Sequence, residues 1–226
     1  MKQKHAYFLL AAALLAGGCD DDGDDGGDPS GPSGSTMTFF VTSATNATGN
    51  LGGLAGADGR CQNLAAAVGA GSRTWRAYLS VERDAATGQA VDARSRIGSG
   101  PWVNAAGTRV AQDLAELHTR RGDAALFVDE RNQRINGQWA GSPQPVEHDI
   151  LTGSTADGRL MPGMTCGDWT SASATLAAQV GHSDGLGPNM NAAGALSSWN
   201  SAHANESCAN TTPRGGSGRI YCFATN

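Results

Sequence analysis

The chain has 226 residues, a formal net charge of −5 and only 16% charged residues, which is the length of one domain with tails. Beyond the first 36 residues, 14 arginines stand against 15 acidic residues, so this part is nearly neutral. Because a neutral surface lacks the cations that bind phosphates, we expect no nucleic-acid binding and no polybasic contact with a membrane surface. Glycine is frequent, at 32 residues, and only 6% of residues are aromatic, which favours a loop-rich domain over a helical bundle.

The amino-terminal residues have the pattern of a bacterial export signal. Lys2 and Lys4 precede an uninterrupted apolar run over 6–16, which is too short to cross a bilayer as a helix. The small residues that follow, directly before Cys19, resemble the site where a lipoprotein signal peptide is cleaved. We therefore expect a signal peptide over 1–18 and a lipid on Cys19; the alternative is ordinary cleavage, with Cys19 discarded or left as a free thiol.

Residues 19–36 are expected to form a lipidated cysteine and a tether. The segment is rich in aspartate, glycine, proline and serine and has no apolar residue after Cys19, so nothing in it offsets the entropy of ordering. We expect residues 37–226 to form the folded domain. A flexible spacer of this kind favours a lipid-anchored place in the bacterial cell envelope, on the outer membrane or cell surface rather than the inner membrane, with the lipid as the only membrane contact.

The folded segment begins and ends with β-prone runs, over 38–42 and 219–225. A third strand is predicted over 74–81, where alternation would bury Trp75 and turn Tyr78 outward.

Two helices are predicted between these strands. Cys61, Leu64, Ala65 and Val68 have helical spacing, which buries Cys61 on the apolar face of the first helix, and Gly69 suits the position after its end. A second short helix is indicated by the spacing of three apolar residues, Val110, Leu114 and Leu117.

The rest of the chain carries weaker patterns. Residues 125–128 and 133–135 indicate a weak hairpin, and residues 136–218 are expected to be largely irregular. The sequence thus predicts an α+β fold with two helices, short mixed or antiparallel strands, long irregular loops, and first and last strands that pair.

Four cysteines remain beside Cys19, and four cysteines in an exported domain allow three disulfide pairings. They are Cys61, Cys166, Cys208 and Cys222. None forms a C-x-x-C pair, which argues against a zinc knuckle or a thioredoxin-like site. A nested pairing, Cys61 with Cys222 and Cys166 with Cys208, would join the first helix to the last strand, and we favour it because the two ends of the fold are expected to pair.

Several motifs resemble the endostatin-like branch of the C-type lectin-like fold, in the order found there. They are Gly56–Asp58 followed by Cys61, Trp75–Ser80, Ile150–Ser154 with Asp157–Arg159, Cys166 with Trp169 and Thr170, and Ile220–Cys222. The segment 40–62 is also similar to bacterial endostatin-like lipoproteins of an unknown-function class, some of which are surface adhesins for host proteins. The resemblance implies a C-type lectin-like (endostatin-like) domain that binds an extracellular protein or glycan.

The same resemblance implies ion sites that this sequence does not carry. Endostatin holds zinc largely through histidines at its amino end, and residues 37–46 contain none. The calcium triplets of true C-type lectins correspond to 187–189 and 199–201 here, and each lacks a carboxylate that a cation with six to eight oxygen ligands would need. We therefore predict no metal ligand and no cofactor.

Seven side chains in the long irregular segment are candidates for ligand binding: His148, Asp149, His182, Asp184, Trp199, Asn200 and His203. If the loops converge, they would form a polar pocket with an aromatic wall, suited to a sugar or to a histidine-rich metal site. The alternative is that these groups hydrogen-bond the long loops to one another. Trp199 is expected to be exposed on its loop, where the indole would contact a ligand instead of packing in the core.

We thus expect a lipoprotein that presents a non-enzymatic binding domain, with no catalytic residue. Three alternatives stay open: a strict carbohydrate-binding lectin, a metal-dependent hydrolase that uses the His148, His182 and His203 loops, and a structural envelope protein.

Overall fold

The computed structural model describes residues 35–225. The helices are α1 (Gly53–Ala67), α2 (Leu114–Thr119) and the four-residue α3 (Cys166–Trp169). The strands are β1 (Phe39–Val41), β2 (Trp75–Ala77), β3 (Trp102–Val103), β4 (Arg109–Ala111), β5 (Asp149–Leu151), β6 (Gln179–His182), β7 (His203–Ala204) and β8 (Gly216–Ala224). Short 3₁₀ turns, η1 (Ala93–Arg96), η2 (Pro188–Met190) and η3 (Gly194–Ser197), complete the elements. The fold is α+β, as the sequence predicts.

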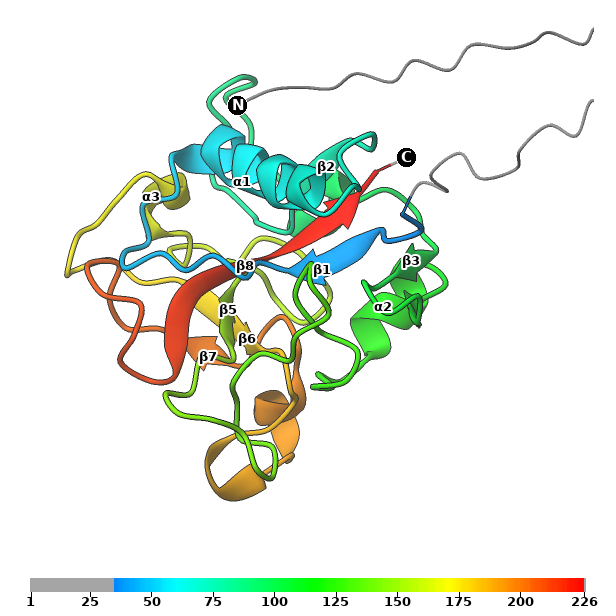
Figure 1. Cartoon of the computed structure of the whole chain (residues 1–226). Coiled ribbons are helices and arrows are strands. Elements are labelled where there is room, and N and C mark those ends of the chain that lie inside the picture. Colours follow the sequence, from blue (N-terminus) through cyan, green and yellow to red (C-terminus); the bar gives the residue numbers. More distant parts are fainter. Residues whose placement is uncertain (1–34, 226) are drawn as a thin grey trace, which may run out of the picture. The chain divides into compact units, whose positions relative to one another are not determined.

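Strand β8 is the centre of the main sheet. It pairs antiparallel with β1 and with β2, and its first half pairs parallel with β5. The sheet then continues through β6 to β7, so the order is β1-β8-β5-β6-β7 (Figure 1). The expected pairing of the first and last strands is present, with Phe39 opposite Phe223.

Side chains alternate across β1 and β8, and each face of the sheet has its own apolar core. Phe40 and Ile220 belong to the core under α1, whereas Phe39 and Tyr221 belong to an aromatic cluster on the opposite face. The cluster is rich in rings: Phe39, Tyr78, Trp102, Phe127, Trp199, Tyr221 and Phe223 are all fully buried. This packing fixes the far end of the sheet, where β5, β6 and β7 lie.

Two disulfides add covalent links to this framework. Cys61 of α1 is joined to Cys222 of β8, and Cys166 of α3 is joined to Cys208. These are the nested pairs that the sequence favoured. The first helix begins at Gly53, earlier than its apolar spacing suggests, and Gly69 lies in the left-handed region at its end, where glycine is favoured.

The strand predicted over 74–81 is shorter than expected. Only Trp75–Ala77 forms β2, and both Tyr78 and Ser80 are buried rather than on a polar face. Beyond Ala77 the chain is no longer a strand but stays buried, and Ser80 N–H donates to the carbonyl of Thr152 at 3.0 Å. The alternating pattern therefore continues past the true end of the strand.

Other expectations need similar correction. Val110 belongs to β4, and α2 begins only at Leu114, after Asp113 caps its first turn by accepting from Glu116 N–H at 2.9 Å. The weak hairpin is reduced to one isolated bridge between Val128 and Arg134. The segment 136–218 is not simply irregular, since it supplies β5, β6 and β7 to the main sheet.

Two expectations, the signal peptide and the lipidated tether, concern the amino-terminal part. The signal peptide, Cys19 and the tether up to residue 34 lie outside the described residues. Among the described residues, none of the helices has the length and apolar character needed to span a membrane.

Candidate metal centre

Strands β5, β6 and β7 bring three histidines and an aspartate together. Asp149 in β5 is directly opposite His182 in β6, and His203 in β7 is opposite Val180, two residues from His182. Residues at such direct and diagonal positions on one face of a sheet are within side-chain reach. His148 precedes β5, where the register with β8 shifts between Asp149 and Ile150, and its ring stacks on that of His182 with centroids 4.3 Å apart.

The potential ligand atoms converge on the carboxylate of Asp149. Its Oδ1 lies 3.3 Å from Nε2 of His148 and 3.3 Å from Nε2 of His182. His203 approaches from the other side, with Nε2 at 3.6 Å from Oδ2 of Asp149 and 2.9 Å from Nε2 of His182. The atoms of His148, Asp149 and His182 all lie within 4.8 Å of one another, which is close enough to hold one ion.

The opposite nitrogen of each imidazole is held by an oxygen. Nδ1 of His148 donates to Oδ1 of Asp184 at 2.7 Å, and Nδ1 of His182 donates to the carbonyl of Leu196 at 2.9 Å. Nδ1 of His203 lies 3.0 Å from the carbonyl oxygen of Ala204. Since carbonyl and carboxylate oxygens only accept, each Nδ1 carries a proton, so in its neutral form each ring turns an Nε2 lone pair toward Asp149.

This arrangement lacks a donor at its centre. With neutral rings, three Nε2 lone pairs and a carboxylate face one another, and Oδ1 of the buried Asp149 has no hydrogen-bond partner among the described residues. A buried carboxylate oxygen without a partner is costly, so a cation is needed to offset the repulsion. The missing cation is either a shared proton or a metal ion. Histidines whose Nδ1–H is fixed by a carboxylate or carbonyl are the usual ligands of bound metals.

Asp184 supports the cluster from outside. Burial disfavours its charge, but the hydrogen bond from His148, with further bonds from Gln138 N–H and Leu186 N–H, outweighs burial and lowers the pKa of Asp184. The ionised carboxylate orients the His148 ring and makes its Nε2 a better ligand.

A close approach of two segments sets the position of β7. A Cβ on Gly181 in β6 would collide with the carbonyl of Trp199. Because Gly181 has no side chain, residues 199–200 lie against β6, and β7 follows directly beside His182.

The histidines form one wall of a pocket of about 350 Å³. It is lined by Gln138, His148, His182, Pro188, Leu196, His203 and Arg214. His148 and His182 are almost fully buried, while the side chain of His203 is 23% exposed. The site is therefore reachable from solvent on the side of His203 and Arg214.

The structure does not bring all seven sequence candidates to this site. Trp199 is fully buried in the aromatic cluster, and its Nε1–H donates to the carbonyl of Leu117 at 3.0 Å. The expectation of an exposed indole was wrong, because the segment that carries Trp199 turns under β6 rather than outward. The pocket consequently has no wall formed by this indole.

Asn200 belongs to a separate polar network. Its amide donates to the hydroxyl of Tyr78 at 2.9 Å and to the carbonyl oxygens of Thr155 and Ala156. Tyr78 in turn lies 2.8 Å from Nε2 of His118. Asn200 thus hydrogen-bonds the loops to one another, which is the alternative that the sequence analysis gave for these residues.

The sequence analysis did not identify two further residues that line the pocket, Gln138 and Arg214. Gln138 lies 10 residues before His148 and Arg214 lies 11 residues after His203, and no motif marks either of them. Only the three-dimensional structure brings them to the histidines.

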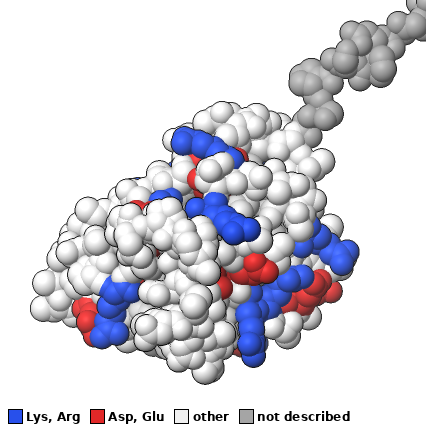
Figure 2. Space-filling view, turned by 60° about the horizontal axis from the view of Figure 1, so that its bottom comes forward, with Lys and Arg blue, Asp and Glu red and all other residues white. Residues whose placement is uncertain are grey.

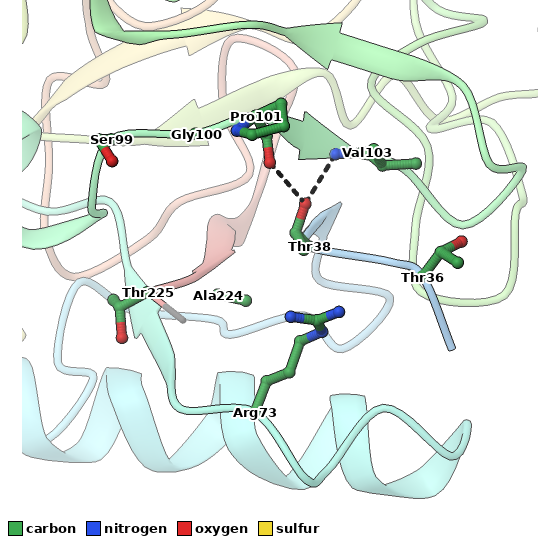
Figure 3. Close-up of a pocket in the computed structure, with 9 residues that line it drawn as sticks. All are labelled: Thr36, Thr38, Arg73, Ser99, Gly100, Pro101, Val103, Ala224 and Thr225. Atoms are coloured by element: carbon green, nitrogen blue, oxygen red, sulfur yellow. Dashed lines mark hydrogen bonds between the residues drawn. The ribbon is translucent and has the colours of Figure 1, made fainter. Parts of the chain in front are cut away.

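A second hollow of about 330 Å³ lies near the ends of the described segment (Figure 3). Thr38 lies in this hollow, and its hydroxyl accepts from Val103 N–H at 2.7 Å and donates to the carbonyl of Pro101 at 3.4 Å. Its lining is mostly threonine, glycine and small apolar residues, with Arg73 as the charged member. This hollow offers no convergent set of ligands comparable to the histidine cluster.

The surface charges also agree with the composition. On the face shown in Figure 2, basic and acidic side chains lie next to one another rather than gathering by sign. Exposed ion pairs also occur among the described residues, such as Arg159 with Asp157 at 2.9 Å. This face offers no broad basic surface of the kind that phosphates require.

The fold and site define a disulfide-bonded α+β domain with a buried cluster of histidines and an aspartate. Residues 44–186 match the family described as "Protein of unknown function (DUF1554)", and the chain belongs to this family. No curated protein matches the chain. The matched segment includes His148, Asp149 and His182, whereas His203 lies beyond it.

Proposed function

We propose that this protein is a non-enzymatic binding module held at the bacterial envelope by a lipid on Cys19, and that its ligand site is a transition-metal centre, with Zn²⁺ as the first candidate. The observation that carries the metal is the convergence of three imidazole Nε2 atoms and one carboxylate with no donor between them. The sequence analysis kept a histidine-rich metal site as an alternative, and the geometry favours it over the expectation of no metal ligand.

The distances suit a tetrahedral ion. Ligands at about 2.0–2.1 Å from a tetrahedral zinc lie about 3.3 Å from one another. Both His148 Nε2 and His182 Nε2 are 3.3 Å from Asp149 Oδ1. Nε2 of His203 lies 2.9 Å from Nε2 of His182 and 3.6 Å from Oδ2, the other oxygen of Asp149, so His203 is a fourth ligand only if its ring shifts toward the ion. Imidazole suits zinc and its neighbours in the transition series, whereas calcium and magnesium prefer oxygen.

Binding is favoured over hydrolysis because the nearby carboxylate is already engaged. Asp184 accepts from His148 Nδ1, from Gln138 N–H at 2.6 Å and from Leu186 N–H at 3.0 Å. A general base must be free to accept a proton from water, and Asp184 is not. We therefore retain a binding role and not the metal-dependent hydrolase.

The C-type lectin-like fold is also part of this proposal. Its supports are the paired terminal strands β1 and β8, the link from α1 to β8 through Cys61 and Cys222, and the long loops between short strands. The strict lectin alternative loses its aromatic wall, since Trp199 is in the core. A structural envelope protein would have no need for a buried set of unpaired ligands.

Metal analysis of the purified protein tests the centre directly. We expect one zinc ion per chain in protein prepared without chelator, and a saturable zinc titration at neutral pH after chelator treatment. Asp149→Asn and His182→Ala remove ligands, so each should weaken zinc binding by more than the 10–100-fold that loss of an outer partner costs. His118→Gln is the matched control, because His118 lies outside the cluster and should leave zinc affinity unchanged.

A protein that folds, as judged by circular dichroism, but binds no zinc, cobalt, nickel or copper would show that the central cation is a proton. A glycan array and a panel of extracellular matrix proteins, probed with and without zinc, then separate a sugar ligand from a protein ligand.

A further inference from the structure

The mouth of the histidine pocket carries a single arginine in an unusual backbone conformation. Arg214 lines the pocket and has a φ of 130°, a value that side chains other than glycine rarely adopt. Such outliers are kept where the surrounding structure requires them, and they are common at binding sites.

The backbone beside Arg214 lies directly against the ligands. Asp149 N–H donates to the carbonyl of Gly215 at 3.0 Å. A Cβ on Gly215 would be 3.4 Å from Nε2 of His148, so the backbone at Gly215 runs next to this ligand atom. Arg214 therefore directly precedes Gly215, whose backbone contacts the proposed metal centre.

The guanidinium of Arg214 is paired with a carboxylate in the free protein. Its partner is Glu206, and both side chains are solvent-exposed, at 49% and 60%. Burial of the pair is slight, so water can replace it at little cost. Glu206 itself shows that a carboxylate fits against this guanidinium at the pocket mouth.

The charges at the centre favour an anion. Three neutral imidazoles and one carboxylate leave a divalent ion with one uncompensated positive charge, and Arg214 adds another at the mouth. Asp184 is separated from the ligand atoms by the ring of His148, since it bonds to the far nitrogen. Beside the polar Gln138, the pocket is lined by Pro188 and Leu196, whose apolar surface suits the carbon skeleton of a ligand.

We infer that the pocket binds a carboxylate-bearing ligand, with one carboxylate oxygen on the metal and the group held by Arg214 in place of Glu206. This inference rests on the proposed metal centre. It requires the ion to accept a ligand on its pocket side, either by expanding to five ligands or because His203 moves aside. Arginine matches the planar geometry of a carboxylate through its two parallel N–H groups.

The test uses the protein loaded with Co²⁺, whose visible absorption spectrum reports its coordination. Acetate is the probe, and inorganic phosphate is the comparison. We expect acetate to change the spectrum in a saturable manner. Arg214→Met should weaken acetate binding about tenfold or more, since a charge-assisted hydrogen-bond pair is lost. The same variant should leave the Co²⁺ affinity and the acetate-free spectrum unchanged.

Glu206→Gln gives the opposite result, because it removes the carboxylate that competes for Arg214; acetate should bind more tightly. Arg159→Met is the matched control, as Arg159 is another exposed arginine paired with a carboxylate, Asp157. Failure of Co²⁺ to bind would contradict the metal centre itself. Co²⁺ binding without an acetate response, a response to phosphate alone, or equal acetate affinity in Arg214→Met would overturn the carboxylate inference and leave a closed metal site.

Discussion

The Nε2 atoms of His182 and His203 lie 2.9 Å apart, and the opposite nitrogen of each ring faces a carbonyl oxygen, that of Leu196 or Ala204. Two lone pairs at this distance repel each other unless a cation lies between them. This relationship makes the stability of the fold dependent on what occupies the site.

Chelation should therefore lower the melting temperature. A ligand present at a hundred times its dissociation constant stabilises the folded state by about 2.7 kcal/mol. For a domain of this size that corresponds to a shift of roughly 5–10 °C. Differential scanning calorimetry with zinc and with chelator measures the shift. In Asp149→Asn the difference between the two conditions should vanish; an equal shift in that variant would place the bound zinc elsewhere.

Trp199→Ala should destabilise the fold by about 3–5 kcal/mol, the usual cost of removing a core tryptophan. The indole is fully buried and packs near Tyr78 and Tyr221, with ring centroids at 4.8 and 5.0 Å. Urea unfolding measures the loss. Trp139→Ala is the control, since Trp139 is only partly buried and should cost less. A loss below about 1 kcal/mol for Trp199 would be incompatible with this packing.

The two disulfides should differ in their contributions. Cys61 and Cys222 are 161 residues apart, and Cys166 and Cys208 are 42 residues apart. Loop-closure entropy gives upper values of about 5 and about 4 kcal/mol for replacement of each pair by alanine. Unfolding free energies of the two double variants test this order. Peptide mapping without reductant should find the same two pairs, and a peptide that joins Cys61 to Cys166 would contradict the fold.

His118 should make stability fall at mildly acidic pH. Burial lowers its pKa below 6.5, and the positive charge of Arg94 adds to this effect, while the Leu114 carbonyl and Asp157 act in the opposite direction. The neutral ring accepts from the Tyr78 hydroxyl through Nε2, and protonation of Nε2 ends that bond. The unfolded chain takes up the proton first, so this contribution is complete above pH 6.5 and is lost as the pH falls through the lowered pKa.

Urea unfolding of the wild type and His118→Gln between pH 7.5 and 5, with chelator present, measures this effect. The two proteins differ only at residue 118, so the other pH-dependent contributions cancel in the difference. The loss of stability on acidification should be smaller in His118→Gln. Equal losses in the two proteins would mean that His118 contributes nothing.

The lipid anchor predicts a change in cellular fractionation. Cys19→Ala should move the protein from the membrane fraction to the soluble fraction, because Cys19 is the expected site of the lipid. Fractionation followed by immunoblotting measures the distribution. Persistent membrane association of the variant would contradict the anchor.

Sequence patterns predict the parts of this fold that are local. The helix around Cys61 and the strands over 38–42 and 219–225 have periodic or β-prone sequences, and each is present close to the predicted place. Their pairing also favours the link between Cys61 and Cys222. By contrast, β5 and β7 are three and two residues long, too short to show a period of two.

The site could be predicted only in part for the same reason. The sequence identifies the polar side chains that can bind a ligand in the long loop-rich segment: His148, Asp149, His182 and His203. That these side chains converge depends on the pairing of β5, β6 and β7. The exposure of Trp199 could not be predicted, since it depends on the space that Gly181 leaves beside β6.

The central place of β8 has a consequence for the order of folding. Phe39 pairs with Phe223 and Trp75 with Ala224, so the ladders that join β1 and β2 to the main sheet form only when the last strand is available. In a chain threaded through a membrane from its amino end, these apolar strands emerge long before β8. Contacts of such long sequence separation fold slowly. In an exported chain, which the proposed lipid anchor implies, residues 39–77 therefore stay exposed to pairing with other chains until β8 closes the sheet.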